Sequence, residues 1–232
     1  MTLEIKYLGH SAFQFNVANK QILIDPFLTQ SPWYDGDLSE FNPEHIFLTH
    51  AHSDHLGDAI EISKRTGATI HAVYELALYC QDKGANVNPV NIGASLKFSD
   101  WGIVTFMPAS HSSSTPDGQY GGVAASLMFR FKDKKVFHAG DTALTADLKM
   151  IGDTYKPDVA MLPIGGQFTM GIKEAVLAAQ WLNAKKVIPM HYNTFPPINV
   201  DINDFTSLLE SESMIKPVVL KAGETISCAL KC

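Results

Sequence analysis

The stretch Thr49-His50-Ala51-His52-Ser53-Asp54-His55-Leu56-Gly57 places four potential metal-ligating side chains within six residues. It follows the apolar run at residues 46–49, which is typical of a buried strand, and precedes a helical pattern at residues 59–66. Because a segment between a strand and a helix can turn its side chains in two directions, one pair can face one ion and the other pair a second. Imidazole and carboxylate together suit Zn²⁺, Fe²⁺ or Mn²⁺. A solvated polar loop without ligands is the alternative interpretation.

The composition is that of one globular domain. A chain of 232 residues without a long Pro/Gly/Ser linker or a fixed repeat predicts a single domain over residues 1–232. The net charge of −6 argues against a nucleic-acid partner, because such binding usually relies on clustered Lys and Arg. A small-molecule partner is the remaining expectation, together with a homo-oligomer on general grounds.

The cellular location is predicted from what the sequence lacks. No run of ~18 apolar residues occurs, so we expect no membrane span. Residues 1–8 alternate charged and apolar side chains and have no basic start, so we expect no export signal. The odd set Cys80, Cys228 and Cys232, with no C-x-x-C spacing, indicates reduced thiols. These features together predict a cytoplasmic protein.

Strand patterns recur in both halves of the chain, each with helical patterns beside them. Residues 3–8, 12–17 and 21–24 predict a meander with a tight turn at residues 18–20. Further strands are expected at residues 46–49, 68–71, 103–107, 123–131, 135–139, 159–162 and 186–189. Helices are expected at residues 59–66, 73–83, 145–151, 174–182 and 205–209. Two sheets packed face to face and covered by helices follow from this order, an α+β four-layer αββα sandwich.

Three further potential ligands lie just past predicted strand ends. His111 follows the strand at residues 103–107, Asp141 follows the strand at 135–139, and His191 follows the strand at 186–189. Any one of them alone would be interpreted as a structural residue, since lone His and Asp residues usually are. Their common position relative to strands makes them candidates as a set.

Six short motifs, together with the histidine-rich stretch, occur in an order that resembles a known family. They are residues 8–13 (LGHSAF), 23–27 (LIDPF), 110–113 (SHSS), 139–142 (AGDT), 162–166 (LPIGG) and 189–196 (PMHYNTFP). With them, nearly the whole chain resembles the metallo-β-lactamase superfamily, in its branch of small bacterial and archaeal metal-dependent hydrolases of unassigned substrate.

The resemblance implies two divalent ions at one edge of the sheets, zinc first, with manganese or iron as alternatives. It assigns His50, His52 and His111 to the first ion, and Asp54, His55 and His191 to the second. It makes Asp141 the bridge between them. It also implies a hydrolase that uses hydroxide activated by the two metals, with Asp54 as both ligand and catalytic residue that orients the water and takes its proton.

The substrate stays open at this level, because members of this superfamily act on many compounds. An ester-like or phosphodiester-like small molecule is expected, with lactone hydrolysis as an alternative. A metal-binding or sensor protein without turnover is a second class of function that keeps the same ligands. His52 stands where redox di-iron relatives carry Glu, which favours hydrolysis.

The remaining polar residues receive structural roles. Asp25 is expected to accept hydrogen bonds from the histidine-rich stretch, because a carboxylate after a buried run would otherwise be costly. His45 is expected at the surface and His71 to be packed or solvated. His10 and His138 are each either second-sphere or structural. The serines at residues 112–114 are expected to shape a loop or support ligands, and the loops at residues 168–171 and 193–197 either face substrate or pack ordinarily.

Overall fold

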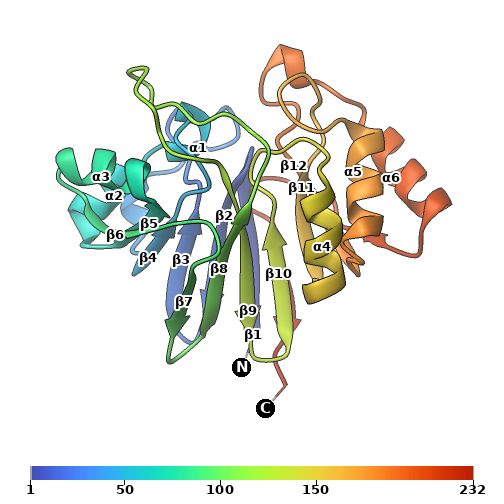
Figure 1. The fold of residues 1–232 in the computed structure, drawn as a ribbon, viewed down its shortest axis with the longest axis horizontal. Helices are drawn as coiled ribbons and strands as arrows, with labels where there is room; N and C mark the ends of the chain where they lie inside the picture. The colour runs from blue at the N-terminus through green and yellow to red at the C-terminus, as the bar shows by residue number, and fades with distance from the viewer. Residues whose placement is uncertain (1, 232) are drawn as a thin grey trace.

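Two seven-stranded sheets form the centre of the computed structural model, which describes residues 2–231 (Figure 1). The first sheet has the order β14-β1-β2-β3-β4-β5-β6. Its strands are β1 (Thr2–Gly9), β2 (Ala12–Val17), β3 (Lys20–Ile24), β4 (His45–Phe47), β5 (Thr69–Val73), β6 (Asn86–Val90) and β14 (Thr225–Ala229). The second has the order β13-β12-β11-β10-β9-β8-β7. Its strands are β7 (Ser95–Phe98), β8 (Gly102–Pro108), β9 (Ala125–Phe131), β10 (Lys134–His138), β11 (Val159–Pro163), β12 (Lys186–Met190) and β13 (Lys216–Pro217).

The sheets pack through aromatic side chains on their inner faces. Phe129 of β9 has ring centroids 5.0 Å from Phe15 of β2 and 5.4 Å from Phe47 of β4, and all three rings are fully buried. Rings at such distances add edge-to-face attraction to the burial of apolar area. The core therefore lies between the sheets.

Helices cover the outer faces and complete the four layers (Figure 1). The helices α2 (Ala59–Thr66) and α3 (Tyr74–Asp82) contact the first sheet through β5, and α3 also contacts β6. On the other side, α5 (Ile172–Trp181) contacts β11, with α4 (Ala146–Tyr155) and α6 (Ile202–Glu212) packed against it. The predicted α+β four-layer αββα sandwich is confirmed.

Most predicted elements are present with ends shifted by a few residues. The strand Ala12–Val17 and the helix Ala59–Thr66 have the predicted bounds. The predicted turn at residues 18–20 joins β2 to β3, with Ala18 and Asn19 at φ of 52° and 60°. Positive φ at two central residues matches the twist of a two-residue hairpin.

The elements that sequence patterns missed are short or lie at sheet edges. The edge strand β6 contains Pro89, which cannot donate to a ladder, and β7 and β14 alternate half-buried with exposed residues. The one-turn helix α1 (Ser53–Leu56) and the 3₁₀ turns Leu38–Glu40 and Pro196–Ile198 are too short for a periodic signal. Tertiary pairing, rather than local pattern, determines these segments.

Two predictions from the sequence, reduced thiols and the lack of a membrane span, can be compared with the described residues. Within residues 2–231, Cys80 and Cys228 form no disulfide, and Cys232 lies outside the described residues. In residues 2–231, no helix combines the length and apolar character that crossing a membrane requires. The single domain over residues 1–232 stays a prediction.

Candidate metal centre

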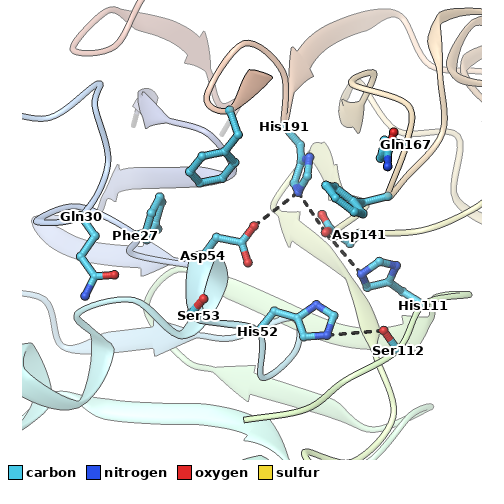
Figure 2. Close-up of a pocket in the computed structure, with 12 residues that line it drawn as sticks. Phe27, Gln30, His52, Ser53, Asp54, His111, Ser112, Asp141, Gln167 and His191 are labelled. Atoms are coloured by element: carbon cyan, nitrogen blue, oxygen red, sulfur yellow. Dashed lines mark hydrogen bonds and ion pairs between the residues drawn. The ribbon is translucent and has the colours of Figure 1, made fainter. Parts of the chain in front are cut away.

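The seven proposed ligands lie together at one edge of the two sheets. Figure 2 shows His52, Asp54, His111, Asp141 and His191 of this set. The stretch at residues 48–57 leaves β4, while the other three residues follow the second sheet: His111 after β8, Asp141 after β10 and His191 directly after β12. Connections at one end of neighbouring strands meet in space, which is why residues far apart in sequence converge here.

A single turn of helix divides the histidine-rich stretch into two groups. His52 has extended backbone and precedes α1, whereas Asp54 and His55 lie on that helix. The sequence predicts a segment whose side chains turn in two directions. The structure has a strand end followed by a helical turn, and His50 and His52 belong to one group of potential ligands whereas Asp54 belongs to another.

The first group contains only imidazoles. Nε2 of His50 lies 3.0 Å from Nδ1 of His52. The ring centroid of His111 is 5.1 Å from those of both other rings. Ligand nitrogens from all three lie within 4.8 Å of one another.

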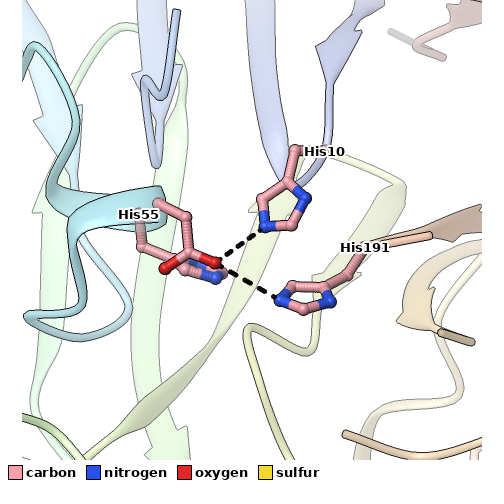
Figure 3. Close-up of side chains that lie close together, drawn as sticks. His10, His55 and His191 are labelled. Carbon is pink, nitrogen blue, oxygen red and sulfur yellow. Dashed lines mark hydrogen bonds and ion pairs between the residues drawn. The ribbon is translucent and has the colours of Figure 1, made fainter. Parts of the chain in front are cut away.

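The second group surrounds the Asp54 carboxylate. Asp54 and His55 come from α1, and His191 approaches from the end of β12. Nε2 of His191 lies 3.7 Å from Oδ2 of Asp54. His10, from the end of β1, completes this group (Figure 3).

Asp141 lies between the two groups. Its Oδ1 is 3.2 Å from Nε2 of His55, and its Oδ2 is 3.0 Å from Nε2 of His191. The same Oδ2 lies 3.5 Å from Nε2 of His111 and 3.9 Å from Nε2 of His50. One carboxylate is therefore within reach of imidazoles from both groups, as a bridging ligand would be.

Several of these atoms are buried and have no hydrogen-bond partner among the described residues. They are Nε2 of His55, Oδ1 of Asp141 and both ring nitrogens of His191. Buried polar atoms normally have a partner. Nε2 of His55 and Nε2 of His191 lie 3.2 Å and 3.0 Å from the Asp141 carboxylate and so face one shared space, whereas Nδ1 of His191 is on the other side of its ring. The donor set of imidazoles and carboxylates suits Zn²⁺, Mn²⁺ or Fe²⁺, so the residues fit divalent metal ions.

Glycine before Asp141 is required by close packing. Gly140 has φ of 59°, and a Cβ there would lie 2.8 Å from the Ala125 carbonyl oxygen and 2.9 Å from the Thr49 Cβ. Asp141 therefore approaches the histidine-rich stretch closely because its neighbour has no side chain.

The predicted support role of Asp25 is confirmed. Its Oδ1 accepts the backbone N–H of Thr49 at 2.8 Å, and its Oδ2 accepts the Thr49 hydroxyl at 2.6 Å and Nδ1 of His55 at 2.7 Å. Because Nδ1 of His55 donates to a carboxylate, Nε2 is the nitrogen that faces Asp141 and that becomes available to a metal when the ring is neutral. A carboxylate behind a ligand histidine is a recurrent way to set its tautomer and orientation.

Three residues of this edge have left-handed backbone. His10, Asp25 and His191 have φ of 54°, 44° and 55°. Such values are uncommon for residues other than glycine and cluster at functional sites, where the surrounding structure holds them.

The direction of the pKa shift differs among the histidines of the centre. Burial lowers the pKa of His50 well below its usual range, so this imidazole is neutral. Burial alone would also lower the pKa of His191, but the Asp141 and Asp54 carboxylates outweigh it and raise the pKa to about 9. Asp141 and Asp25 similarly hold the pKa of His55 well above its usual value despite burial.

The Asp54 carboxylate is kept ionised. Burial would raise the pKa of Asp54, yet the hydrogen bond from His10 and the nearby imidazoles of His191 and His55 hold it well below its usual range. Its side chain is 25% exposed, so it can meet both water and substrate.

A cavity of about 700 Å³ opens onto the centre (Figure 2). His52, Asp54, His111, Asp141 and His191 form its polar floor. Its other lining residues are Phe27, Gln30, Ser53, Ser112, Gln167, Phe168 and Phe195. Of the two loops expected to face substrate or to pack, each contributes one phenylalanine.

The structure assigns clear contacts to the remaining histidines. His138 is buried, donates from Nε2 to the Ser11 carbonyl at 3.0 Å and accepts the Gly140 N–H at 3.1 Å, so it supports the turn before Asp141. The prediction that His45 lies at the surface is wrong. Its Nδ1 lies 3.1 Å from Nε2 of His71, and its half-buried side chain packs against aromatic rings. The prediction for His45 failed because β7, the strand that covers it, was not predicted from the sequence.

The serines after His111 shape the loop, as expected. Ser113 donates to the Gly121 carbonyl at 3.2 Å and accepts the Ala51 N–H at 3.2 Å. Ser112 lies 3.4 Å from Nε2 of His52.

Four residues near the centre were not identified from the sequence. Gln30 and Gln167 line the cavity, and Trp33 and Thr194 form hydrogen bonds that lead to His10. Thr194 lies inside a recognised motif, whereas nothing in the sequence connects Trp33 with it.

Comparisons with known proteins agree with this arrangement. A family model described as a beta-lactamase superfamily domain matches residues 20–192. A UPF0173 metal-dependent hydrolase from Bacillus cereus is 44% identical over 230 residues, which cover 97% of this chain and 100% of the relative. A UPF0173 metal-dependent hydrolase from Staphylothermus marinus is 46% identical over 230 residues, covering 96% and 98%. The solved structure of a metallo hydrolase from the archaeon Ignicoccus hospitalis has 39% identity and a TM-score of 0.90 over 100% of both chains.

Proposed function

Since the chain belongs to the metallo-β-lactamase superfamily and is a metal-dependent hydrolase, we propose that it cleaves an ester-like or phosphodiester-like small molecule with two divalent metal ions. In this proposal His50, His52 and His111 hold the first ion. Asp54, His55 and His191 hold the second, and Asp141 bridges both. Zinc is the metal that the imidazole-rich set suits best, with Mn²⁺ and Fe²⁺ as alternatives.

The observation that carries the proposal is the convergence of buried, unpartnered ligand atoms at the floor of an open cavity. Within residues 2–231, Nε2 of His55 and Oδ1 of Asp141 have no hydrogen-bond partner, and Asp141 reaches imidazoles of both groups. A structural site would be closed by protein ligands, whereas this floor faces about 700 Å³ of space.

The ions would lower the pKa of water from ~15.7 toward ~7 and polarise the substrate's carbonyl or phosphoryl oxygen. Asp54 orients the attacking water and takes its proton, because its carboxylate is ionised and partly open to the cavity. No serine nucleophile is required, since water activated by the ions would attack the substrate. Ser113 is engaged in a loop contact, and Ser112 lies beside Nε2 of His52, which this proposal assigns to the first ion.

The cavity wall favours an ester-like substrate over a phosphate monoester. None of its lining residues is Lys or Arg, the side chains that usually bind a doubly charged phosphate. Phe27, Phe168 and Phe195 instead offer apolar surface, and the Gln30 and Gln167 amides can hydrogen-bond a carbonyl or hydroxyl. A lactone with an apolar substituent suits this wall as well as an open-chain ester.

The test is a substrate panel on metal-free protein reloaded with Zn²⁺, Mn²⁺ or Fe²⁺. The panel contains p-nitrophenyl butyrate, an aromatic lactone, a thioester, bis(p-nitrophenyl) phosphate, p-nitrophenyl phosphate and a β-lactam. We expect turnover of at least one ester, lactone or diester that disappears on metal removal, with no turnover of the monoester. Full metal loading without hydrolysis of any compound would instead support a metal-binding or sensor protein.

A further inference from the structure

A chain of hydrogen bonds reaches Asp54 from outside the proposed ligand set. Nε1 of Trp33 donates to Oγ1 of Thr194 at 3.1 Å, and this hydroxyl lies 2.8 Å from Nδ1 of His10. Nε2 of His10 lies 3.0 Å from Oδ2 of Asp54. Consecutive hydrogen bonds thus join residues from four separate segments of the sequence.

The chemistry of the two ends decides the direction of the bonds. An ionised carboxylate can only accept, so the proton between His10 and Asp54 belongs to Nε2 of His10. The indole N–H can only donate, so Thr194 receives it on a lone pair. The Thr194 hydroxyl has two acceptors within reach, the Tyr192 carbonyl at 3.4 Å and Nδ1 of His10 at 2.8 Å, and the shorter contact is the one to Nδ1, which has a lone pair when Nε2 carries the proton. Each donor in this series of hydrogen bonds therefore has an acceptor.

The His10 ring is held on every side. It is fully buried, and its centroid lies 4.1 Å from that of His191 and 5.6 Å from that of Phe195. Its backbone carbonyl accepts the Tyr7 hydroxyl at 3.0 Å and the His191 N–H at 2.9 Å. A ring fixed in this way can hold the carboxylate that it faces in one rotamer.

His10 also belongs by distance to the group of potential ligands around Asp54 (Figure 3). The contacts favour a supporting role for Nε2 instead, because it is already engaged with Oδ2 of Asp54 at 3.0 Å. The other nitrogen, Nδ1, faces Thr194 and points away from the group.

We propose that His10 is a positioning residue, itself oriented by Thr194 and Trp33, that holds Asp54 by donating from Nε2 and does not bind metal. The proposal rests on the proposed function only in giving Asp54 a role in hydrolysis. His10 leaves the second Asp54 oxygen free for metal and water.

Two substitutions of His10 distinguish the role of its Nε2 from that of its Nδ1. The His10→Gln amide can replace the Nε2 donor toward Asp54, whereas the His10→Asn amide is shorter and replaces only the Nδ1 position. Asn also tolerates the left-handed backbone at this residue, where φ is 54°. A loss in His10→Asn is therefore not explained by backbone strain.

We expect both variants to bind as much Zn²⁺ per chain as the unmodified protein. With p-nitrophenyl butyrate, or the panel compound that is turned over, His10→Asn should lose about tenfold to a hundredfold in kcat with little change in KM. His10→Gln should stay within about threefold. Loss of an ion from His10→Asn would make His10 a ligand, and unchanged kcat at full loading would remove its positioning role.

A second readout does not depend on turnover, so it remains decisive if the proposed function fails. In zinc-loaded protein with ¹⁵N-labelled histidine, the His10 resonances, identified by their loss in His10→Asn, should show a proton on Nε2 and none on Nδ1. Thr194→Val should shift the Nδ1 resonance, while Thr194→Ser, which keeps the hydroxyl, should not. A proton on Nδ1 with Nε2 bare would overturn the proposal.

Discussion

His55 donates from Nδ1 to Oδ2 of Asp25 at 2.7 Å, while its Nε2 lies 3.2 Å from Asp141 on the opposite side of the ring. Both Asp25 and His55 are fully buried. One carboxylate thereby determines which nitrogen of His55 faces the proposed metals.

Replacing Asp25 by Asn should weaken metal binding without removing a ligand. The Asn amide can accept the Thr49 N–H but turns an N–H₂ group toward His55, which favours the tautomer with a proton on Nε2. We expect Zn²⁺ affinity to fall about 10–100-fold. Competition with a chromogenic chelator measures it, and Asp58→Asn, outside the centre, is the control. Equal affinities in Asp25→Asn and the unmodified protein would contradict this role.

Fully loaded protein should contain close to two divalent ions per chain, because seven ligands exceed the needs of one tetrahedral ion. Asp141→Ala should lower the metal content below that of His111→Ala, since Asp141 is within reach of both groups. Elemental analysis after gel filtration decides both points. One ion or none in the unmodified protein, with His191→Ala unchanged, would refute the dinuclear site.

Asp54→Asn should fold normally and lose about 10²–10⁴ in turnover at saturating metal. The lower end is expected because the His10 hydrogen bond and the nearby histidines hold the pKa of Asp54 well below its usual range despite burial, which makes the carboxylate a weak base that acts largely by orienting the water. Turnover of p-nitrophenyl butyrate, measured alongside metal content, tests it. Turnover equal to that of the unmodified protein would leave Asp54 as a ligand only.

The stability gained from metal should increase as pH rises. The carboxylates of Asp141 and Asp54 outweigh burial and raise the pKa of His191 to about 9, above its unfolded value near 6.5. In metal-free protein this protonated histidine stabilises the fold fully below pH ~6.5, and the contribution is lost as pH rises through about 9. Metal binding requires neutral imidazole ligands, so metal affinity increases as pH rises, opposite to the trend in the metal-free protein.

We therefore expect the difference in Tm between zinc-loaded and metal-free protein to widen from pH 6.5 to pH 9. Thermal unfolding at matched ionic strength measures it. His191→Gln should flatten the pH dependence of the metal-free protein over this range. A constant difference in Tm would show that His191 does not exchange a proton for metal.

Local pattern predicted much of the fold because strands and helices bury periodic faces. The helix Ala59–Thr66 ends at Gly67 with φ of 79°, as a helix stop signal does, and the strand Ala12–Val17 packs in the core. The edge strands β6 and β7 escaped detection because half their side chains remain exposed and carry no comparable pattern.

The candidate ligands can be identified without coordinates, because the density of His and Asp at residues 50–55 and the motifs around the later ligands are visible in the sequence. Their ligation, and the two-metal assignment, remain proposals. How these residues meet became visible in the folded chain. It showed that α1 divides the stretch, that Asp141 lies between two groups, and that Trp33 reaches Asp54 through Thr194 and His10. The physical reason is that hydrogen bonds between segments more than 100 residues apart depend on sheet packing, which no local periodicity encodes.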